Sequence, residues 1–220
     1  LQGTALADLA ASPKRRRTHP AITAFNILRY DAATLGNHEF NYGLEVLERA
    51  VADATFPIVS ANVLRVEGGH TRSLVPPFAV LDRQFTDSRG QAQGLRIGVL
   101  GLTPPEILQW DRAHLEGRVV TRPMLEAARE HVQRLRAEGA DLVVCLAHTG
   151  ISDEPGFAED EGDAASIAAL PGIDVVVAGH THRVFPPNIP RDPSAGLATE
   201  WLLAGKPAVQ AGHSGSHLGI

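Results

Sequence analysis

The sequence predicts a layered α/β domain. Apolar runs of strand length alternate along the chain with segments whose apolar residues recur at helical spacing, a pattern typical of helices packed on a central sheet. Three of the strand-like runs end in glycine or histidine rather than in an ordinary turn. With 220 residues, of which 44% are hydrophobic and 20% charged, the chain can bury one full core.

The N-terminal part predicts helices and strands on either side of a short polar motif. Leu44, Val46, Leu47 and Val51 form an apolar helix face after that motif. The expected elements are, in order, a helical turn over Ala5–Ala10, a helix over Ala21–Tyr30, a strand over Asp31–Leu35, a helix over Leu44–Ala54 and a strand over Phe56–Asn62.

The middle of the chain predicts a loop, two strands and the clearest helix. Pro123 suits the first turn of that helix, and Gly139 suits its C-terminal cap. His131 falls on its apolar face and is interpreted as a structural histidine. The expected elements are a loop over Arg65–Pro76, strands over Phe78–Phe85 and Leu95–Gly101, an irregular segment over Thr103–Gly117 and a helix over Pro123–Glu138.

The C-terminal part predicts two buried strands, each followed by histidine. The first includes the single cysteine, Cys145, which is expected to pack as a small apolar residue. The expected elements are a strand over Leu142–Ala147, a surface loop over Ser152–Asp163, a helix over Ala164–Leu170, a strand over Ile173–Ala178, an irregular Pro-rich segment over Phe185–Gly205 and a closing hairpin of Pro207–Ala211 with His217–Ile220.

Composition excludes several classes of protein. The net charge of −5, without a long basic stripe, argues against binding a nucleic-acid polymer through its phosphates. The one basic run, Lys14–Arg17, is expected to be a solvated loop. A single cysteine excludes an internal disulfide and a cysteine metal cluster. No apolar run approaches the ~18 residues of a membrane span.

Polar residues at three strand ends predict a metal site. Asn37 and His38 follow the first strand, His148 follows the next, and His180 and His182 follow the last. Carboxyl ends of parallel strands meet at one sheet edge, so these side chains are expected to gather there. Imidazole and amide ligands suit a borderline divalent cation such as Zn, Mn, Fe or Co.

The sequence also suggests how the last two histidines reach one site. Gly179 would let the backbone turn sharply, and residues two apart on an extended backbone share a side, so His180 and His182 could both point inward. Each histidine alone is more often packed or on the surface, and the joint pattern favours the metal reading. Two such ions would polarise a phosphoryl group and activate water, although this ligand set is short of negative charge.

Two segments carry a more specific signature. They are Gly36-Asn37-His38-Glu39-Phe40-Asn41-Tyr42-Gly43 and Thr103-Pro104-Pro105-Glu106-Ile107-Leu108-Gln109-Trp110-Asp111. They resemble the calcineurin-like metallophosphoesterases, in particular the 5′-nucleotidase branch and within it the 2′,3′-cyclic-nucleotide 2′-phosphodiesterase/3′-nucleotidases. Phe56–Asn62 and Gly215–Gly219 fit the same family. The resemblance implies an αββα sandwich, two divalent metal ions, a nucleotide substrate and a periplasmic or secreted location.

The resemblance also implies roles for individual residues. His38 would protonate the leaving oxygen or stabilise the charged transition state without binding metal. Asn41 stands where 5′-nucleotidases have an aspartate that orients this histidine, and an amide can bond the imidazole but cannot raise its pKa by charge. The implied ligands are Asn37, His148 and His180 for one ion and His182 for the other.

The chain departs from the family at both ends. The family's Asp-x-His motif and its Gly-Asp motif, whose carboxylate bridges the metals, do not occur at the start of this chain, and Leu1-Gln2-Gly3 resembles the residues that follow that aspartate. We therefore expect residues 1–220 to be a partial, N-terminally truncated catalytic domain without the family's C-terminal nucleotide-binding domain. Alone it should bind metal weakly and be nearly inactive. Trp110 is expected to be an ordinary core or surface aromatic.

The function expected from the resemblance is hydrolysis of 2′,3′-cyclic nucleotides and 3′-nucleotides. Two alternatives stay open. One is a 5′-nucleotidase or UDP-sugar hydrolase, and the other is a catalytically inactive remnant that keeps the fold and part of the ligand set. Oligomeric state and base preference have no signal in the sequence.

Overall fold

The computed structural model describes residues 1–3, 5–11, 18–151, 164–186 and 202–219. Its helices are α1 (Ala5–Ala11), α2 (Pro20–Leu28), the 3₁₀ helix η1 (Asn37–Glu39), α3 (Leu44–Asp53), α4 (Ile107–Trp110), α5 (Arg112–Leu115), α6 (Met124–Ala137) and α7 (Ala164–Ala169). Its strands are β1 (Ala33–Thr34), β2 (Ile58–Val59), β3 (Val63–Glu67), β4 (His70–Ser73), β5 (Phe78–Thr86), β6 (Ala92–Leu102), β7 (Val119–Thr121), β8 (Leu142–Ala147), β9 (Val175–Ala178), β10 (Val184–Phe185), β11 (Leu202–Leu203) and β12 (Lys206–Ala211).

A mixed sheet organises the molecule. Its strands run in the order β10-β12-β9-β8-β6-β5, with β11 paired to β12. The inner strands β6, β8, β9 and β12 are parallel to one another, while β5 and β10 run antiparallel to their neighbours. The parallel strands therefore end at one edge, where the predicted histidines follow β8 and β9.

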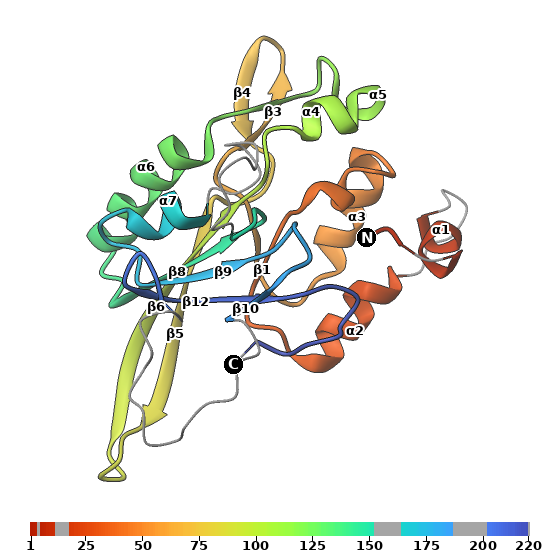
Figure 1. Cartoon of the computed structure of the whole chain (residues 1–220). Coiled ribbons are helices and arrows are strands. Elements are labelled where there is room, and N and C mark those ends of the chain that lie inside the picture. Colours follow the sequence, from red (N-terminus) through yellow and green to blue (C-terminus); the bar gives the residue numbers. More distant parts are fainter. Residues whose placement is uncertain (4, 12–17, 152–163, 187–201, 220) are drawn as a thin grey trace.

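The elements form four layers, helix on sheet on sheet on helix (Figure 1). Helices α6 and α7 cover one face of the large sheet, where Val143, Cys145 and Ala147 of β8 are buried with them in one core. The two-stranded parallel sheet β1-β2 packs on the other face against β6 and β8, and α2 and α3 lie beyond it. The expected αββα sandwich is confirmed.

A second core lies between the small sheet and the outer helices. Leu35, Phe40 and Leu44 are fully or nearly fully buried in it, so the polar motif between β1 and α3 is anchored by apolar residues on both sides. The small sheet covers only part of the large one. Beside it, Val144, Leu146 and other half-buried side chains line an open groove of about 820 Å³.

Two loop assignments from the sequence are wrong. Residues 65–76, expected to be a loop, contain most of the antiparallel hairpin of β3 and β4, whose turn is Gly68-Gly69 with φ of 57° and 82°. The segment 103–117, expected to be irregular, contains the short helices α4 and α5. β4 contains no apolar residue, so it lacks the alternation that marks a half-buried strand, although Leu64 and Val66 alternate with Arg65 and Glu67 in β3.

The predicted C-terminal hairpin is also wrong. β12 forms as expected, but it inserts beside β9 in parallel and pairs with β10 in antiparallel. Residues 217–219 form no strand. The surface-loop expectation for Ser152–Asp163 and the basic run Lys14–Arg17 lie outside the described residues. No helix in the described part of the chain is long and apolar enough to cross a membrane.

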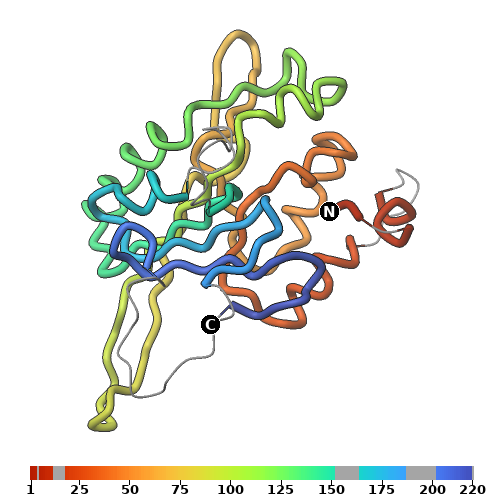
Figure 2. Tube along the Cα trace, in the orientation of Figure 1, coloured from red at the N-terminus to blue at the C-terminus, as the bar shows by residue number. Residues whose placement is uncertain are grey.

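Figure 2 shows two further features of the trace. The β5–β6 hairpin extends well beyond the rest of the large sheet. The start of the chain lies beside the turn that follows β1, where the Leu1 backbone nitrogen is 2.6 Å from Glu39 Oε1.

Candidate metal centre

The polar turn after β1 is held in one conformation by a buried phenylalanine and a side-chain hydrogen bond. Phe40 is buried at 0% exposure and anchors the turn, while the Gly36 backbone nitrogen donates to Glu39 Oε2 at 2.6 Å. His38 lies in the 3₁₀ helix η1 and Asn41 lies in the turn that follows it. The two side chains meet, with Nδ1 and Oδ1 2.8 Å apart. His38 itself is exposed and faces solvent.

A buried polar cluster holds the strand ends around this turn. Thr103, at the end of β6, donates through Oγ1 to the Leu35 carbonyl at 2.9 Å. Its backbone nitrogen donates to Asn62 Oδ1 at 2.9 Å, and Asn62 Nδ2 donates to the Thr103 carbonyl at 2.7 Å. Ser60 Oγ lies 2.8 Å from Thr103 Oγ1. These bonds fix the ends of β1, β2 and β6 relative to one another.

His148 follows β8 and points at the same turn. Its Nε2 lies 2.9 Å from Asn37 Oδ1, across 111 residues of sequence. Its ring rests on Gly36, where an added Cβ would lie 2.6 Å from His148 Cε1. Burial lowers the pKa of His148 to about 4, with opposing and reinforcing effects from Glu39 and the neighbouring histidines. The imidazole is therefore neutral near pH 7, the form that binds metal.

The turn carrying His180 and His182 differs from its predicted form. Both residues have left-handed backbones, with φ of 69° and 60°, and Gly179 is not among the glycines with positive φ. The extended-backbone argument for their shared direction is therefore wrong. Thr181 between them accepts a hydrogen bond at 2.8 Å from Gln210 Nε2, and Gln210 is 1% exposed on β12. Left-handed non-glycine residues are strained, and such strain is concentrated at functional sites.

The histidine rings gather at the edge of the large sheet. The ring centroids of His148 and His180 are 5.2 Å apart. Trp110 stacks on His180 with ring centroids 5.5 Å apart, and it is 44% exposed, as expected for a surface aromatic. His182 lies against His213 with centroids 5.2 Å apart, a neighbour that the sequence did not single out. The charges of His180, His38 and His182 each lower the pKa of His148.

These residues fit a divalent cation in donor chemistry and partly in number. Ligand atoms about 2.1 Å from one ion lie ~3 Å apart in octahedral coordination and ~3.4 Å apart in tetrahedral coordination, so the 2.9 Å between Asn37 Oδ1 and His148 Nε2 is nearer the octahedral value. Both donors are uncharged. The described residues nevertheless bring together no group of three or more His, Cys, Asp or Glu side chains that could hold an ion. The chain thus supplies part of a ligand set.

Asp111 joins the site without having been predicted. Its Oδ1 accepts a hydrogen bond at 2.8 Å from Asn41 Nδ2, so it stands directly behind the residue that contacts His38. The side chain is 5% exposed. The only sequence signal was its place at the end of the Thr103–Asp111 segment, next to Trp110.

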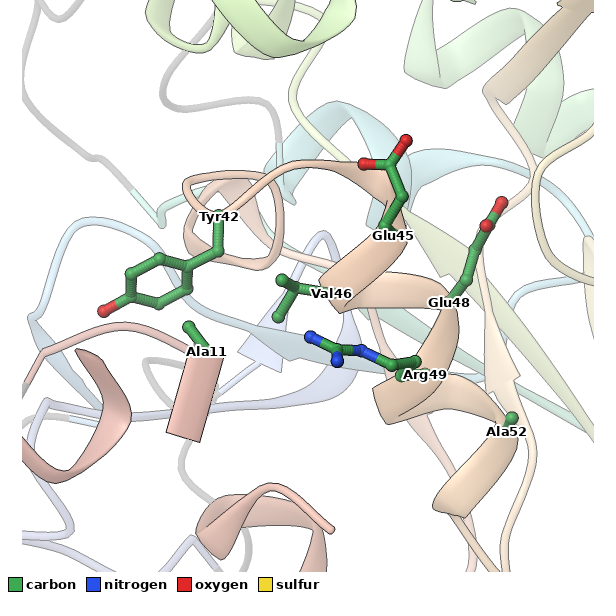
Figure 3. A pocket seen from close by; sticks show the side chains of 7 residues that line it. All are labelled: Ala11, Tyr42, Glu45, Val46, Glu48, Arg49 and Ala52. Carbon is green, nitrogen blue, oxygen red and sulfur yellow. The ribbon is translucent and has the colours of Figure 1, made fainter. Parts of the chain in front are cut away.

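One cavity lies apart from the histidines. It measures about 690 Å³ and runs between α1 and α3 (Figure 3). Tyr42, Val46 and Arg49 face Ala11 across it, and the Tyr42 hydroxyl donates to the Asp8 carboxylate, which raises the pKa of Tyr42 to about 12. None of its lining residues in the described part of the chain is a predicted ligand.

Gly36→Ala tests whether metal binding depends on the observed position of the His148 ring. The φ of Gly36 is −107°, which suits any residue, and the three atoms nearest to an added Cβ all belong to the His148 imidazole. Overpacking of this kind costs about 1–3 kcal/mol, and we expect the ring to shift and metal affinity to fall. Metal titration and urea unfolding measure the two effects. Gly94→Ala, which meets nothing within 4 Å, is the control. Unchanged metal affinity in Gly36→Ala would separate His148 from metal binding.

Two named proteins align with this chain over its whole length. A Haemophilus influenzae protein named 2′,3′-cyclic-nucleotide 2′-phosphodiesterase/3′-nucleotidase is 39% identical over 223 residues, which is 100% of this chain and 34% of that protein. A Bacillus subtilis protein named trifunctional nucleotide phosphoesterase YfkN is 35% identical, over 100% of this chain and 15% of its own length. The chain spans about a third or less of the length of these curated relatives.

Solved structures agree. The crystal structure of the calcineurin-like phosphoesterase YfkN from Bacillus subtilis superposes with a TM-score of 0.83 at 35% identity, covering 96% of this chain and 64% of that one. A 5′-nucleotidase precursor from Thermus thermophilus gives a TM-score of 0.66 at 27% identity, covering 96% and 37%. The family model described as calcineurin-like phosphoesterase matches residues 13–184. The chain therefore belongs to the calcineurin-like phosphoesterase family.

Proposed function

We propose that the complete protein carrying this chain hydrolyses phosphate esters of nucleotides, with 2′,3′-cyclic nucleotides and 3′-nucleotides as its substrates. The observation that carries the proposal is the convergence of Asn37 and His148, 2.9 Å apart, beside His180 at the sheet edge. The 39% identity to a relative named for these two activities points to the substrate class. A periplasmic or secreted location stays a prediction.

We assign the side chains two roles, metal ligand and proton donor. Asn37, His148 and His180 would hold one divalent ion, and His182 would contribute to a second, with Zn, Mn, Fe or Co suited to nitrogen and amide oxygen. Bound ions would polarise the phosphoryl oxygens and lower the pKa of water. The uncharged donors cannot neutralise two dications, so carboxylates from outside the described residues would have to complete the set.

His38 would act on the ribose oxygen. When water adds its oxygen to phosphorus and the bond from phosphorus to ribose oxygen breaks, that oxygen needs a proton to leave as a hydroxyl. His38 is exposed, and its Nδ1 is engaged by Asn41 at 2.8 Å, which leaves Nε2 to face substrate. We assign it the role of general acid.

A substrate panel tests the proposal. The complete protein, loaded with Zn, Mn or Co, is incubated separately with 2′,3′-cyclic AMP, 3′-AMP and 5′-AMP, and nucleotide products and phosphate are quantified. 2′,3′-Cyclic AMP should be converted first to 3′-AMP and then to adenosine. 3′-AMP should release phosphate. Preference for 5′-AMP would establish the 5′-nucleotidase alternative instead. Absence of turnover together with absence of bound metal would identify an inactive remnant.

A further inference from the structure

A row of three polar side chains runs behind the proposed acid. His38 Nδ1 lies 2.8 Å from Asn41 Oδ1, and Asn41 Nδ2 donates to Asp111 Oδ1 at 2.8 Å. An ionised carboxylate can only accept hydrogen bonds, whereas an amide can present either its oxygen or its nitrogen. The Asp111 carboxylate thus determines which end of the Asn41 amide faces His38, and that end is the oxygen.

We propose that Asp111 is a positioning residue, which acts through Asn41 to keep a hydrogen on His38 Nδ1 in both protonation states. Nε2, directed at the ribose oxygen, then carries the transferable proton in the imidazolium and is left without a hydrogen after the transfer. The inference rests on the proposed function for the role of His38, but the hydrogen-bond order stands on the geometry alone. With the amide oxygen toward it, His38 Nδ1 must be the donor. A flipped amide would offer an N–H to Nδ1 and move the ring hydrogen of the neutral imidazole to Nε2.

The surroundings of Asp111 favour this role over ordinary capping. Asp111 occupies the N-cap of α5, where an aspartate usually accepts a backbone N–H of the first turn. Here it makes no side-chain capping bond and reaches instead to Asn41, 70 residues away. Its backbone is fixed between α4 and α5, accepting from His114 N at 2.8 Å and donating to the Ile107 carbonyl at 2.9 Å. A carboxylate placed in this way is diverted from stabilising its own helix.

In this arrangement the carboxylate does not contact the imidazole directly. A carboxylate that accepts from imidazole Nδ1 would fix the tautomer by itself, whereas here the Asn41 amide lies between Asp111 and His38. The amide can transmit orientation only while its other end is held. The second oxygen, Asp111 Oδ2, is buried and has no hydrogen-bond partner among the described residues, so the bond to Asn41 is the side-chain interaction that the structure gives this carboxylate.

Exchange of the two residues provides the test. In Asp111→Asn the amide of Asn41 loses its fixed orientation. In Asn41→Asp two carboxylates face each other. The double variant Asn41→Asp/Asp111→Asn restores a consistent order, because the carboxylate at 41 accepts from His38 Nδ1 and from the new amide at 111. Glu116→Gln, on the exposed end of α5, removes one nearby negative charge and serves as the control.

Three readouts are taken on the complete protein with ¹⁵N-labelled histidine. Ring ¹⁵N shifts report the tautomer of His38, elemental analysis reports metal content, and kinetics on the substrate panel report kcat and KM. General acid–base catalysis is worth ~10²–10⁴-fold, so partial misorientation should lower kcat about tenfold or more. We expect Asp111→Asn to mix the tautomers and lower kcat, with KM and metal content kept, and the double variant to recover both signals. Asn41→Asp alone should be the least active.

The outcomes separate this inference from the proposed function. A wild-type Nδ1–H signal that persists in Asp111→Asn overturns it, as does a double variant that recovers neither tautomer nor kcat, since Asp111 would then only tie α4–α5 to the turn. If wild-type protein turns over none of the nucleotides, the proposed function fails. The ¹⁵N shifts then still decide whether Asp111 sets the tautomer.

Discussion

His180→Ala in the complete protein is expected to lose at least one metal ion and, with it, phosphate release from every nucleotide in the panel. The His180 ring lies against both His148 and Trp110, with centroids 5.2 and 5.5 Å away, so its removal takes away one of the imidazoles beside the Asn37–His148 pair. Even outer-shell substitutions reduce metal affinity ~10–100-fold, so loss of a direct ligand should exceed about 100-fold. Elemental analysis after dialysis and titration with Zn or Mn measure the change.

Two comparisons make this result specific. His70→Ala removes an exposed imidazole from the β3–β4 hairpin and should leave metal content and turnover unchanged. Trp110→Ala removes the ring stacked on His180 but no ligand, so it should weaken metal binding less than His180→Ala does. A His180→Ala protein that keeps its full metal content would remove His180 from the ligand set. The proposed site would then have to be rebuilt around Asn37 and His148.

The sequence rule for the ligand candidates describes only part of their placement. His148 and His180 follow β8 and β9, which are parallel neighbours in the large sheet and end at one edge. Asn37 follows β1, which belongs to the separate two-stranded sheet, so it reaches His148 through the packing of one sheet on the other. The structure accordingly places His148 Nε2 beside Asn37 Oδ1, although 111 residues separate them.

Asp111 could not be predicted in the same way. Its contact with Asn41 depends on how α4 and α5 pack against the turn after β1, and no periodicity in the sequence specifies that packing. The left-handed backbones of His180 and His182 were hidden for a related reason. Gly179 precedes them and is the residue that local rules choose for a tight turn. The bond from Gln210 to Thr181 that braces these conformations comes from β12, about thirty residues away.

The errors in the fold have equally physical causes. In the β3–β4 hairpin, β4 is polar throughout and Arg72 of β4 bonds to Glu67 of β3 at 2.8 and 2.9 Å, so charge pairing across the strands takes the place of apolar alternation in β4. For β12 the strand itself was predicted and its partner was wrong. Sequence neighbours favour a hairpin, but Ala208–Gln210 pair in parallel with Val176–Ala178, which extends the buried sheet.

His38→Ala should show the opposite division of effects from His180→Ala. Its ring is exposed and bonded to Asn41, and the proposal gives it a proton to deliver but no metal to hold. We expect kcat to fall ~10²–10⁴-fold, the usual contribution of a general acid, while metal content stays at the wild-type level. Kinetics on 2′,3′-cyclic AMP and 3′-AMP, with elemental analysis of the same preparations, give both quantities.

A substrate with a better leaving group sharpens the distinction. A phosphate ester of p-nitrophenol expels an oxygen that needs little protonation, so His38→Ala should lose much less activity on it than on a ribose ester. His180→Ala, lacking the ion, should lose activity on both. Equal metal loss in the two variants would contradict this division of roles and place His38 among the ligands. Equal kinetic loss on both esters with metal retained would instead assign His38 to stabilising charge on the phosphoryl group, with the leaving oxygen protonated by another group.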